Sequence, residues 1–411
     1  MGVRRAAAFW PNTQGSAPFV VAATRELREN SAQMGLSQLL RRRTRNAGVW
    51  LARLNAYLRA AAAEDSPQLN RRLTGIYAAS ATALVAAILL LGWPEDPRAG
   101  ANETRAAVAE AFRLEPIQPI PLSVPLNANR VDLGRRLFFD ARLSRDQSVS
   151  CATCHSLQTG GVDRRQVSQG LSGQPGVINA PTVFNSGFNF AQFWDGRAAS
   201  LEDQINGPVA NPVEMGFDWD GIVERLRADP EYVTAFLVAY DQEPTAELVR
   251  SAIAEFERSL YTPNARFDRY LRGDRTALTE TELEGYGLFK EYGCIACHQG
   301  RNVGGNMFQT FGVVGDYFGN RGNLTEADLG RFNVTGEEAD RHKFKVPSLR
   351  NVALTAPYFH DGTVESLDGA VRTMARYQLG IEMPESDVER IVAFLHTLTG
   401  EYGGRSLAES P

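Results

Sequence analysis

The 411-residue sequence predicts a mainly α-helical fold preceded by one transmembrane helix. Helix-start signals recur through the C-terminal two thirds, no segment sustains the alternation of a β-strand, and residues 73–94 carry no charge. With 43% hydrophobic and 22% charged residues, the composition excludes chain-wide disorder. The net charge of −5 argues against a nucleic-acid binder.

The N-terminal segment is basic. Residues 1–73 contain 12 Arg, no Lys and four acidic residues, so a charge of +8 there leaves −13 for the rest of the chain. Leucines lie at roughly helical spacing among these arginines. Residues 1–72 are therefore expected to be cytoplasmic, either as a basic helix on an anionic membrane or as weakly ordered leader sequence.

Residues 73–94 are predicted to span a membrane. As a helix, 22 residues cover roughly 30 Å of hydrocarbon. Arg71 and Arg72 precede this run, and by the positive-inside rule they place residues 95–411 in the periplasm, anchored in the inner membrane. The alternatives are a buried Ala/Leu helix, or a cleaved signal peptide that leaves a soluble periplasmic protein.

Beyond a proline-rich linker at residues 95–120, helix signals predominate. Residues 231–260 contain two predicted helices, the second with an apolar face. Capping boxes of Thr279 with Glu282, and of Ser386 with Glu389, predict two more helix starts. These two helices are expected to end at Gly293 and Gly400.

All four cysteines lie in two CxxCH pentapeptides that end at His155 and His298. This pattern is the attachment signal of c-type haem, because two thiols add to the vinyl groups and the adjacent His ligates the iron. We expect two haem c groups, haem 1 on His155 and haem 2 on His298. A thioredoxin-like redox pair would need a βαβ context, and a zinc site would leave both histidines unused. The attachment thiols are Cys151, Cys154, Cys294 and Cys297.

The second ligand of each iron separates electron transfer from peroxide chemistry. No histidine lies between His155 and His298, so an open iron is inferred at haem 1. For haem 2, the candidate ligands are Met307, Met374 and Met383. Met374 follows His298 by 76 residues, enough chain to pass round the porphyrin, whereas Met307 follows by only 9.

Residues 125–402 resemble the bacterial dihaem cytochrome c peroxidases and the related dihaem enzyme that matures tryptophan tryptophylquinone. The blocks that carry the resemblance occur in family order and include LGRRLFFDARLSRDQSVSCATCH, FWDGRA, NPVEMG and FKVPSLRNVALTAPYFHDG. The resemblance implies two cytochrome-c-like helical domains. We expect a peroxidatic haem domain at residues 121–272 and an electron-transfer haem domain at residues 273–411.

The resemblance also implies site residues. Glu214, in NPVEMG, would take a proton from bound H2O2 and return it to the departing oxygen, with Gln204 as a nearby distal amide. Trp194 would lie between the haems, and Met374 matches the sixth ligand of haem 2. Asn179, Thr355 and Pro357 match an oxygen-only Ca²⁺ site of the kind that hard cations prefer. His360 is expected to make a hydrogen bond to a haem propionate or at an interface. His342 is expected on the surface, and His396 at an ordinary helix position.

Leu171 departs from the family pattern. Many members place a histidine near this position, and it caps the peroxidatic iron until haem 2 is reduced. Leucine cannot ligate iron, so haem 1 is expected to stay open. The quinone-maturing enzyme has a tyrosine where this chain has Met374, which argues against that activity.

The sequence therefore predicts an anchored periplasmic dihaem peroxidase that reduces H2O2 to water. Its expected electron donor is a small cytochrome c or cupredoxin, and a homodimer is among the expected assemblies. Two alternatives stay open. One is a peroxide-dependent oxidase of a protein or organic substrate, and the other is a pure electron-transfer protein with both irons six-coordinate.

Overall fold

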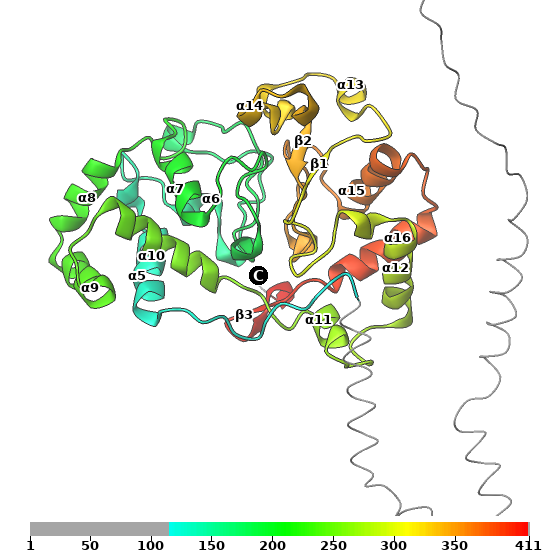
Figure 1. The fold of residues 1–411 in the computed structure, drawn as a ribbon, viewed down its shortest axis with the longest axis horizontal. Helices are drawn as coiled ribbons and strands as arrows, with labels where there is room; N and C mark the ends of the chain where they lie inside the picture. The colour runs from blue at the N-terminus through cyan, green and yellow to red at the C-terminus, as the bar shows by residue number, and fades with distance from the viewer. Residues whose placement is uncertain (1–114, 410–411) are drawn as a thin grey trace, which may run out of the picture. The chain divides into compact units, whose positions relative to one another are not determined.

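The computed structural model describes residues 115–409 (Figure 1). The predicted basic segment and membrane span, residues 1–72 and 73–94, lie outside this part of the chain, as does most of the linker. Among the described residues, no helix has the length and apolar character that crossing a membrane requires.

The described residues are mainly helical, as predicted. Helices of the first half are α5 (Ala128–Phe138), α6 (Cys151–Cys154), α7 (Leu201–Ala210), α8 (Trp219–Arg227), α9 (Pro230–Tyr240) and α10 (Ala246–Ser259). Those of the second half are α11 (Arg266–Leu271), α12 (Glu280–Glu291), α13 (Tyr317–Arg321), α14 (Phe332–Thr335), α15 (Leu367–Met374), which a π-helical turn (Ala375–Leu379) continues, and α16 (Glu385–His396). Strands β1 (Phe308–Thr310) and β2 (Lys343–Lys345) form one antiparallel pair, and β3 (Glu401–Tyr402) and β4 (Arg405–Ser406) form another.

The four helices predicted within the described residues are present. Helices α9 and α10 occupy residues 231–260, and α12 opens on the predicted capping box, in which the Thr279 amide donates to Glu282 at 2.9 Å. The box at Ser386 is wrong. Pro384, two residues before Ser386, takes the N-cap position of α16, because its carbonyl accepts the amides of Asp387 and Val388. The end predicted at Gly400 is also wrong, because the helix ends at His396.

Two close helix crossings organise the core. Helices α5 and α10 lie side by side, as do α12 and α16 (Figure 1). At Gly134 an added Cβ would lie 1.8 Å from the carbonyl oxygen of Ala252, and at Gly285 one would lie 1.9 Å from that of Arg390. Glycine thus lets each pair of backbones touch. The first crossing packs Leu137, Phe138 and Phe256, and the second packs Tyr286, Phe289 and Phe394.

The ends of the described chain cross between these two cores. Ile117 is fully buried in the core of α12 and α16, although it precedes α5 in sequence. Leu407, near the C-terminus, instead packs into the core of α5 and α10. The division into haem domains at residues 121–272 and 273–411 stays a proposal, with two hydrophobic cores in its favour.

Candidate haem sites

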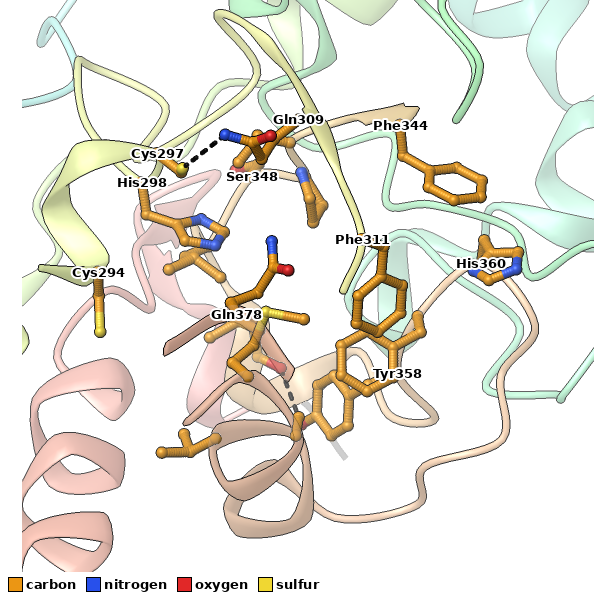
Figure 2. Close-up of a pocket in the computed structure, with 18 of the residues that line it drawn as sticks. Cys294, Cys297, His298, Gln309, Phe311, Phe344, Ser348, Tyr358, His360 and Gln378 are labelled. Carbon is orange, nitrogen blue, oxygen red and sulfur yellow. Dashed lines mark hydrogen bonds between the residues drawn. The ribbon is translucent and has the colours of Figure 1, made fainter. Parts of the chain in front are cut away.

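The second CxxCH motif and Met374 line one cavity of about 410 Å³. A left-handed Gly293 ends α12, and a 3-10 turn over Cys294–Ala296 then presents the thiols and His298. Figure 2 shows the His298 ring pointing into this space. Met374, the last residue of α15, lies on the same cavity. Its volume falls within the usual range for cofactor sites.

The cavity fits a haem chemically. Its walls are largely aromatic and aliphatic, from side chains that include Phe289, Phe311, Tyr358, Leu367, Val371 and Leu395. The Nδ1 atom of His298 is buried without a hydrogen-bond partner, and burial lowers the pKa of this imidazole to about 4. A neutral imidazole is the form that ligates a metal. Met383 also lines the cavity, whereas Met307 is not among its lining residues.

The structure disfavours both alternatives for the cysteines. Within residues 115–409, the only group of three or more His, Cys, Asp or Glu ligand atoms close enough to share a metal contains no cysteine, so the two CxxC pairs do not assemble a zinc site. The strands described form only two-stranded antiparallel pairs, so the βαβ context of thioredoxin is missing there too. Burial raises the pKa of Cys151 to about 12 and of Cys294 to about 11, whereas a thioredoxin-like redox pair uses a thiol of lowered pKa.

The first CxxCH motif forms its own short helix, α6. Ser150 precedes it, and the Ser150 amide donates to the Thr153 hydroxyl at 3.0 Å in a capping box. His155 follows directly, with its Nδ1 atom 3.4 Å from the carbonyl oxygen of Gly161. Burial lowers the pKa of His155, so its ring is neutral. A carbonyl partner of this kind fixes ring orientation and leaves the other nitrogen for iron.

Glu214 lies in the loop that follows α7, the helix that carries Gln204. The Asn211 amide donates to the Glu214 carboxylate at 2.7 Å. Burial raises the pKa of Glu214 and outweighs this hydrogen bond, which acts in the opposite direction. The site thus holds a half-buried carboxyl group that binds a proton more readily than an exposed one.

Leu171 packs directly against the loop that carries Glu214. Its amide donates to the Val213 carbonyl at 2.9 Å, and its side chain is 2% exposed. A Cβ on Gly216 would lie 2.8 Å from the Leu171 side chain, so the two segments are in tight contact. The segment in which the family resemblance would place a capping histidine therefore contributes an apolar group next to the Glu214 loop.

Trp194 lies on the wall of the His298 cavity, although it precedes α7 in sequence. Its indole Nε1 donates to the Asn179 carbonyl at 2.9 Å, and its own carbonyl accepts the Lys345 amide at 2.7 Å. The Trp194 ring stands edge-on to His360, with centroids 6.3 Å apart. A residue of the first half is thus hydrogen-bonded into the second.

The three predicted calcium ligands, Asn179, Thr355 and Pro357, are lining residues of the His298 cavity. Asn179 is buried, and its side-chain amide donates to the Arg165 carbonyl at 2.9 Å. The calcium site stays a prediction.

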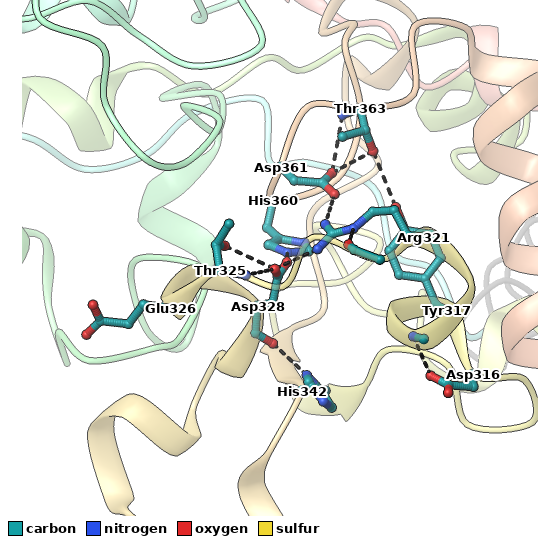
Figure 3. A network of polar contacts seen from close by, with 12 residues as sticks. Asp316, Tyr317, Arg321, Thr325, Glu326, Asp328, His342, His360, Asp361 and Thr363 are labelled. Atoms are coloured by element: carbon teal, nitrogen blue, oxygen red, sulfur yellow. Dashed lines mark hydrogen bonds and ion pairs between the residues drawn. The ribbon is translucent and has the colours of Figure 1, made fainter.

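A polar network around His360 was missed from the sequence (Figure 3). His360 is buried, and its Nε2 lies 2.7 Å from the Asp328 carboxylate. Arg321 pairs with Asp328 at 2.6 Å and also with Asp361. Burial acts against ionisation of Asp328, but hydrogen bonds from Arg321, Thr325 and His360 lower its pKa far below the ordinary value. The single Arg321 guanidinium pairs with both carboxylates, so the group is an ion-pair network.

The remaining histidines give one correction. His342 was expected on the surface, but it is half-buried and stacks on Phe318 with centroids 4.1 Å apart. Its Nδ1 atom lies 2.7 Å from the Asp328 carbonyl oxygen, so it belongs to the same network. His396 is exposed on α16, as expected.

Comparisons with known proteins agree with this geometry. The family model for di-haem cytochrome c peroxidase matches residues 128–276. Cytochrome c peroxidase Ccp of Escherichia coli (strain K12) is 52% identical over 317 residues, which cover 76% of this chain and 67% of that protein. The cytochrome c551 peroxidase of Nitrosomonas europaea is 49% identical over 289 residues, covering 70% of this chain and 85% of the relative.

A solved structure shares the fold. The crystal structure of a MauG-like protein associated with microbial copper homeostasis has a TM-score of 0.61 and 31% identity. The match covers 72% of this chain and 95% of the MauG-like protein. The peroxidases at 52% and 49% identity, with the two CxxCH motifs, make this protein an oxidoreductase that carries two haem c groups and acts on peroxide. The chain belongs to the di-haem cytochrome c peroxidase family.

Proposed function

We propose that the protein reduces H2O2 at haem 1 with electrons that a small cytochrome c or cupredoxin delivers to haem 2. Two electrons and two protons convert one H2O2 into two waters. Haem iron, when bound, supplies the redox equivalents and the coordination position for peroxide. His155 is the proposed protein ligand at haem 1, and His298 and Met374 are those at haem 2.

Glu214 is the proposed acid-base group. In its ionised form it takes the proton from one peroxide oxygen, and it returns that proton to the other oxygen as the O–O bond breaks. A carboxyl group whose pKa burial has raised is suited to both steps, because it binds a proton more readily than an exposed one. Gln204 is proposed to hold the peroxide by a hydrogen bond from its amide.

Trp194 is the proposed link between the haems. Trp194 belongs to the first half of the chain. Its indole donates to the Asn179 carbonyl and its own carbonyl accepts the Lys345 amide, so the ring is held at the wall of the His298 cavity. The proposed calcium ion, bound by Asn179, Thr355 and Pro357, would rigidify the same wall. Because Asn179 belongs to both sets, loss of the ion would loosen the indole hydrogen bond.

Leu171 carries the proposal that haem 1 is open at rest. Its burial against the Glu214 loop places a non-ligating side chain in the segment where many relatives hold a histidine. Peroxide access would then need no earlier reduction of haem 2. We also propose that residues 95–411 work in the periplasm, anchored through residues 73–94.

Spectroscopy and rapid mixing test this proposal together. The resting ferric enzyme should show one high-spin haem and one low-spin haem by electron paramagnetic resonance. It should consume H2O2 with a reduced donor equally well with and without pre-reduction. Two low-spin signals, and a lag abolished by pre-reduction, would show that another group caps haem 1.

A further inference from the structure

Lys345 carries a buried ammonium group that has no partner among residues 115–409. Its side chain belongs to β2 and lines the His298 cavity, and the residue is only 6% exposed. Among the described residues, no carboxylate lies within ion-pair distance of its Nζ atom and none accepts a hydrogen bond from it. An ammonium group taken out of water costs several kcal/mol unless an anion or strong acceptors replace the water.

The other lysine of β2, Lys343, has an ammonium group that is paired with a carboxylate. Lys343 lies two residues earlier, its side chain is 30% exposed, and its Nζ is 3.0 Å from the Asp340 carboxylate. Burial alone lowers the pKa of Lys345 to about 8, with no opposing effect from a neighbouring acid. The group is therefore a cation near neutral pH, and the part of the chain that the structure describes supplies no counter-ion for it.

The cavity itself indicates where the anion comes from. Its polar lining consists largely of neutral groups, including Gln309, Ser348 and Gln378, and the second CxxCH motif opens onto it (Figure 2). The haem attached there brings two propionate carboxylates, which are its only anionic groups. We infer that Lys345 binds a propionate of haem 2 and acts as a positioning residue that sets the charge around this haem.

This pairing has a functional consequence, and it rests on the proposed assignment of haem 2 to His298. Reduction adds one negative charge to the haem, and a fixed cation nearby stabilises that charge, so Lys345 should raise the reduction potential of haem 2. The backbone amide of Lys345 also donates to the carbonyl of Trp194. One residue would thus contact both the electron-accepting haem and the proposed link to haem 1.

Spectroelectrochemical titration of the holoenzyme tests the inference. Lys345→Met, which keeps the chain length and removes the charge, should lower the potential of haem 2 and leave that of haem 1 nearly unchanged. Lys345→Arg should restore most of the shift, and Lys343→Met should cause none. A haem 2 potential in Lys345→Met equal to that of Lys343→Met would overturn the inference.

A second measurement covers the case in which Lys345→Met does not retain haem. Redox-difference infrared spectra of wild type and Lys345→Arg should then differ in the carboxylate bands of haem 2, because a guanidinium and an ammonium bind a carboxylate differently. Identical bands would refute the pairing. The haem assignment is tested separately by His298→Ala, which should remove the low-spin signal whatever the outcome at Lys345.

Discussion

Two buried carboxyl groups behave differently at the scale of single residues. Glu214 keeps a hydrogen bond from Asn211 and lies in a loop, so its proton can exchange. Glu257 lies inside α10 with an exposed fraction of 7%, and its Oε2 atom has no hydrogen-bond partner. Burial raises the pKa of Glu257 to about 8. The environment of Glu214 suits proton transfer, whereas the environment of Glu257 makes the stability of the fold depend on pH.

Glu214→Gln should slow peroxide reduction by about 10²–10⁴-fold, the usual contribution of a general acid-base group. Glutamine keeps an oxygen that can accept from Asn211, so both haem spectra should be preserved. Steady-state H2O2 consumption measures the effect. Glu224→Gln, at an exposed position on α8, serves as the control and should leave the rate unchanged.

The pH profile gives an independent check on Glu214. The ionised carboxylate is the base, and burial raises its pKa, so the rate should fall on the acid side at a pH above the ordinary carboxyl value of about 4.3. Glu214→Gln should lose this acid limb. Wild-type turnover in the variant, or an unchanged acid limb, would remove Glu214 from the mechanism.

Glu257 predicts a pH dependence of stability. The folded protein keeps this proton up to a pKa of about 8, whereas the unfolded chain releases it near 4.3, so the folded state binds more protons between these values. Stability should therefore fall as pH rises through this window, by on the order of a few kcal/mol. Glu257→Gln should gain stability over wild type at pH 8 and little at pH 4, as measured by thermal denaturation. Equal shifts at both pH values would contradict the assignment.

Sequence alone predicts only some of these residues, for a physical reason. Haem attachment depends on a motif of five consecutive residues, and Glu214 lies in a recognisable sequence block. Both could therefore be predicted from the sequence. Glu257, Lys345 and Asp328 owe their properties to burial and to partners distant in sequence. Asp328 left only a weak local signal, because its carboxylate accepts the Thr325 amide three residues earlier in a capping box.

At the scale of elements, the helix crossings depend on single glycines. Gly285→Ala would place a methyl group 1.9 Å from the Arg390 carbonyl oxygen, so α12 and α16 must separate. We expect a loss of about 1–3 kcal/mol or more in the free energy of unfolding, as for other overpacked sites.

Gly287→Ala is the matched control on the same helix. A Cβ at Gly287 meets no atom within 4 Å, so alanine should stabilise α12 by about 0.5–1 kcal/mol through its higher helix propensity. Denaturant unfolding of the two variants measures both effects. Equal stabilities would show that the crossing does not require glycine at residue 285.

Element prediction succeeded where the signal was local. The Thr279 capping box and the apolar face of α10 are patterns within one helix, and both appear in the structure. The Ser386 box failed because Pro384 competes for the same helix end. The close approach at Gly134 and Gly285 could not be predicted, since it depends on a second helix more than 100 residues away in sequence.

At the scale of the whole molecule, the predicted anchor determines where the enzyme works. Mass spectrometry of protein purified from membranes should find residues 73–94 still attached, because Arg71 and Arg72 directly precede this predominantly apolar, charge-free run. Release by detergent but not by salt would agree with a spanning helix. A mature N-terminus at Asn102 would contradict the anchor and preserve export.

The arrangement of the two hydrophobic cores was not accessible from the sequence. The residues around Ile117 were expected to act as a linker, yet Ile117 packs into the core of α12 and α16, which lie in the second half of the chain. Leu407, near the C-terminus, packs into the core of α5 and α10 in the first half. Burial of Ile117 and Leu407 therefore ties each end of the described chain to the half that is more distant in sequence.

The hydrogen bonds around Trp194 give the protein two built-in reporters. The amides of Lys345 and Asn179 donate to carbonyls of Trp194 and His360, so each amide proton joins segments from different halves of the chain. Each can exchange with deuterium only when those segments part. Mass-resolved exchange at these two amides would therefore reveal, without any mutation, whether the halves separate during turnover or stay closed.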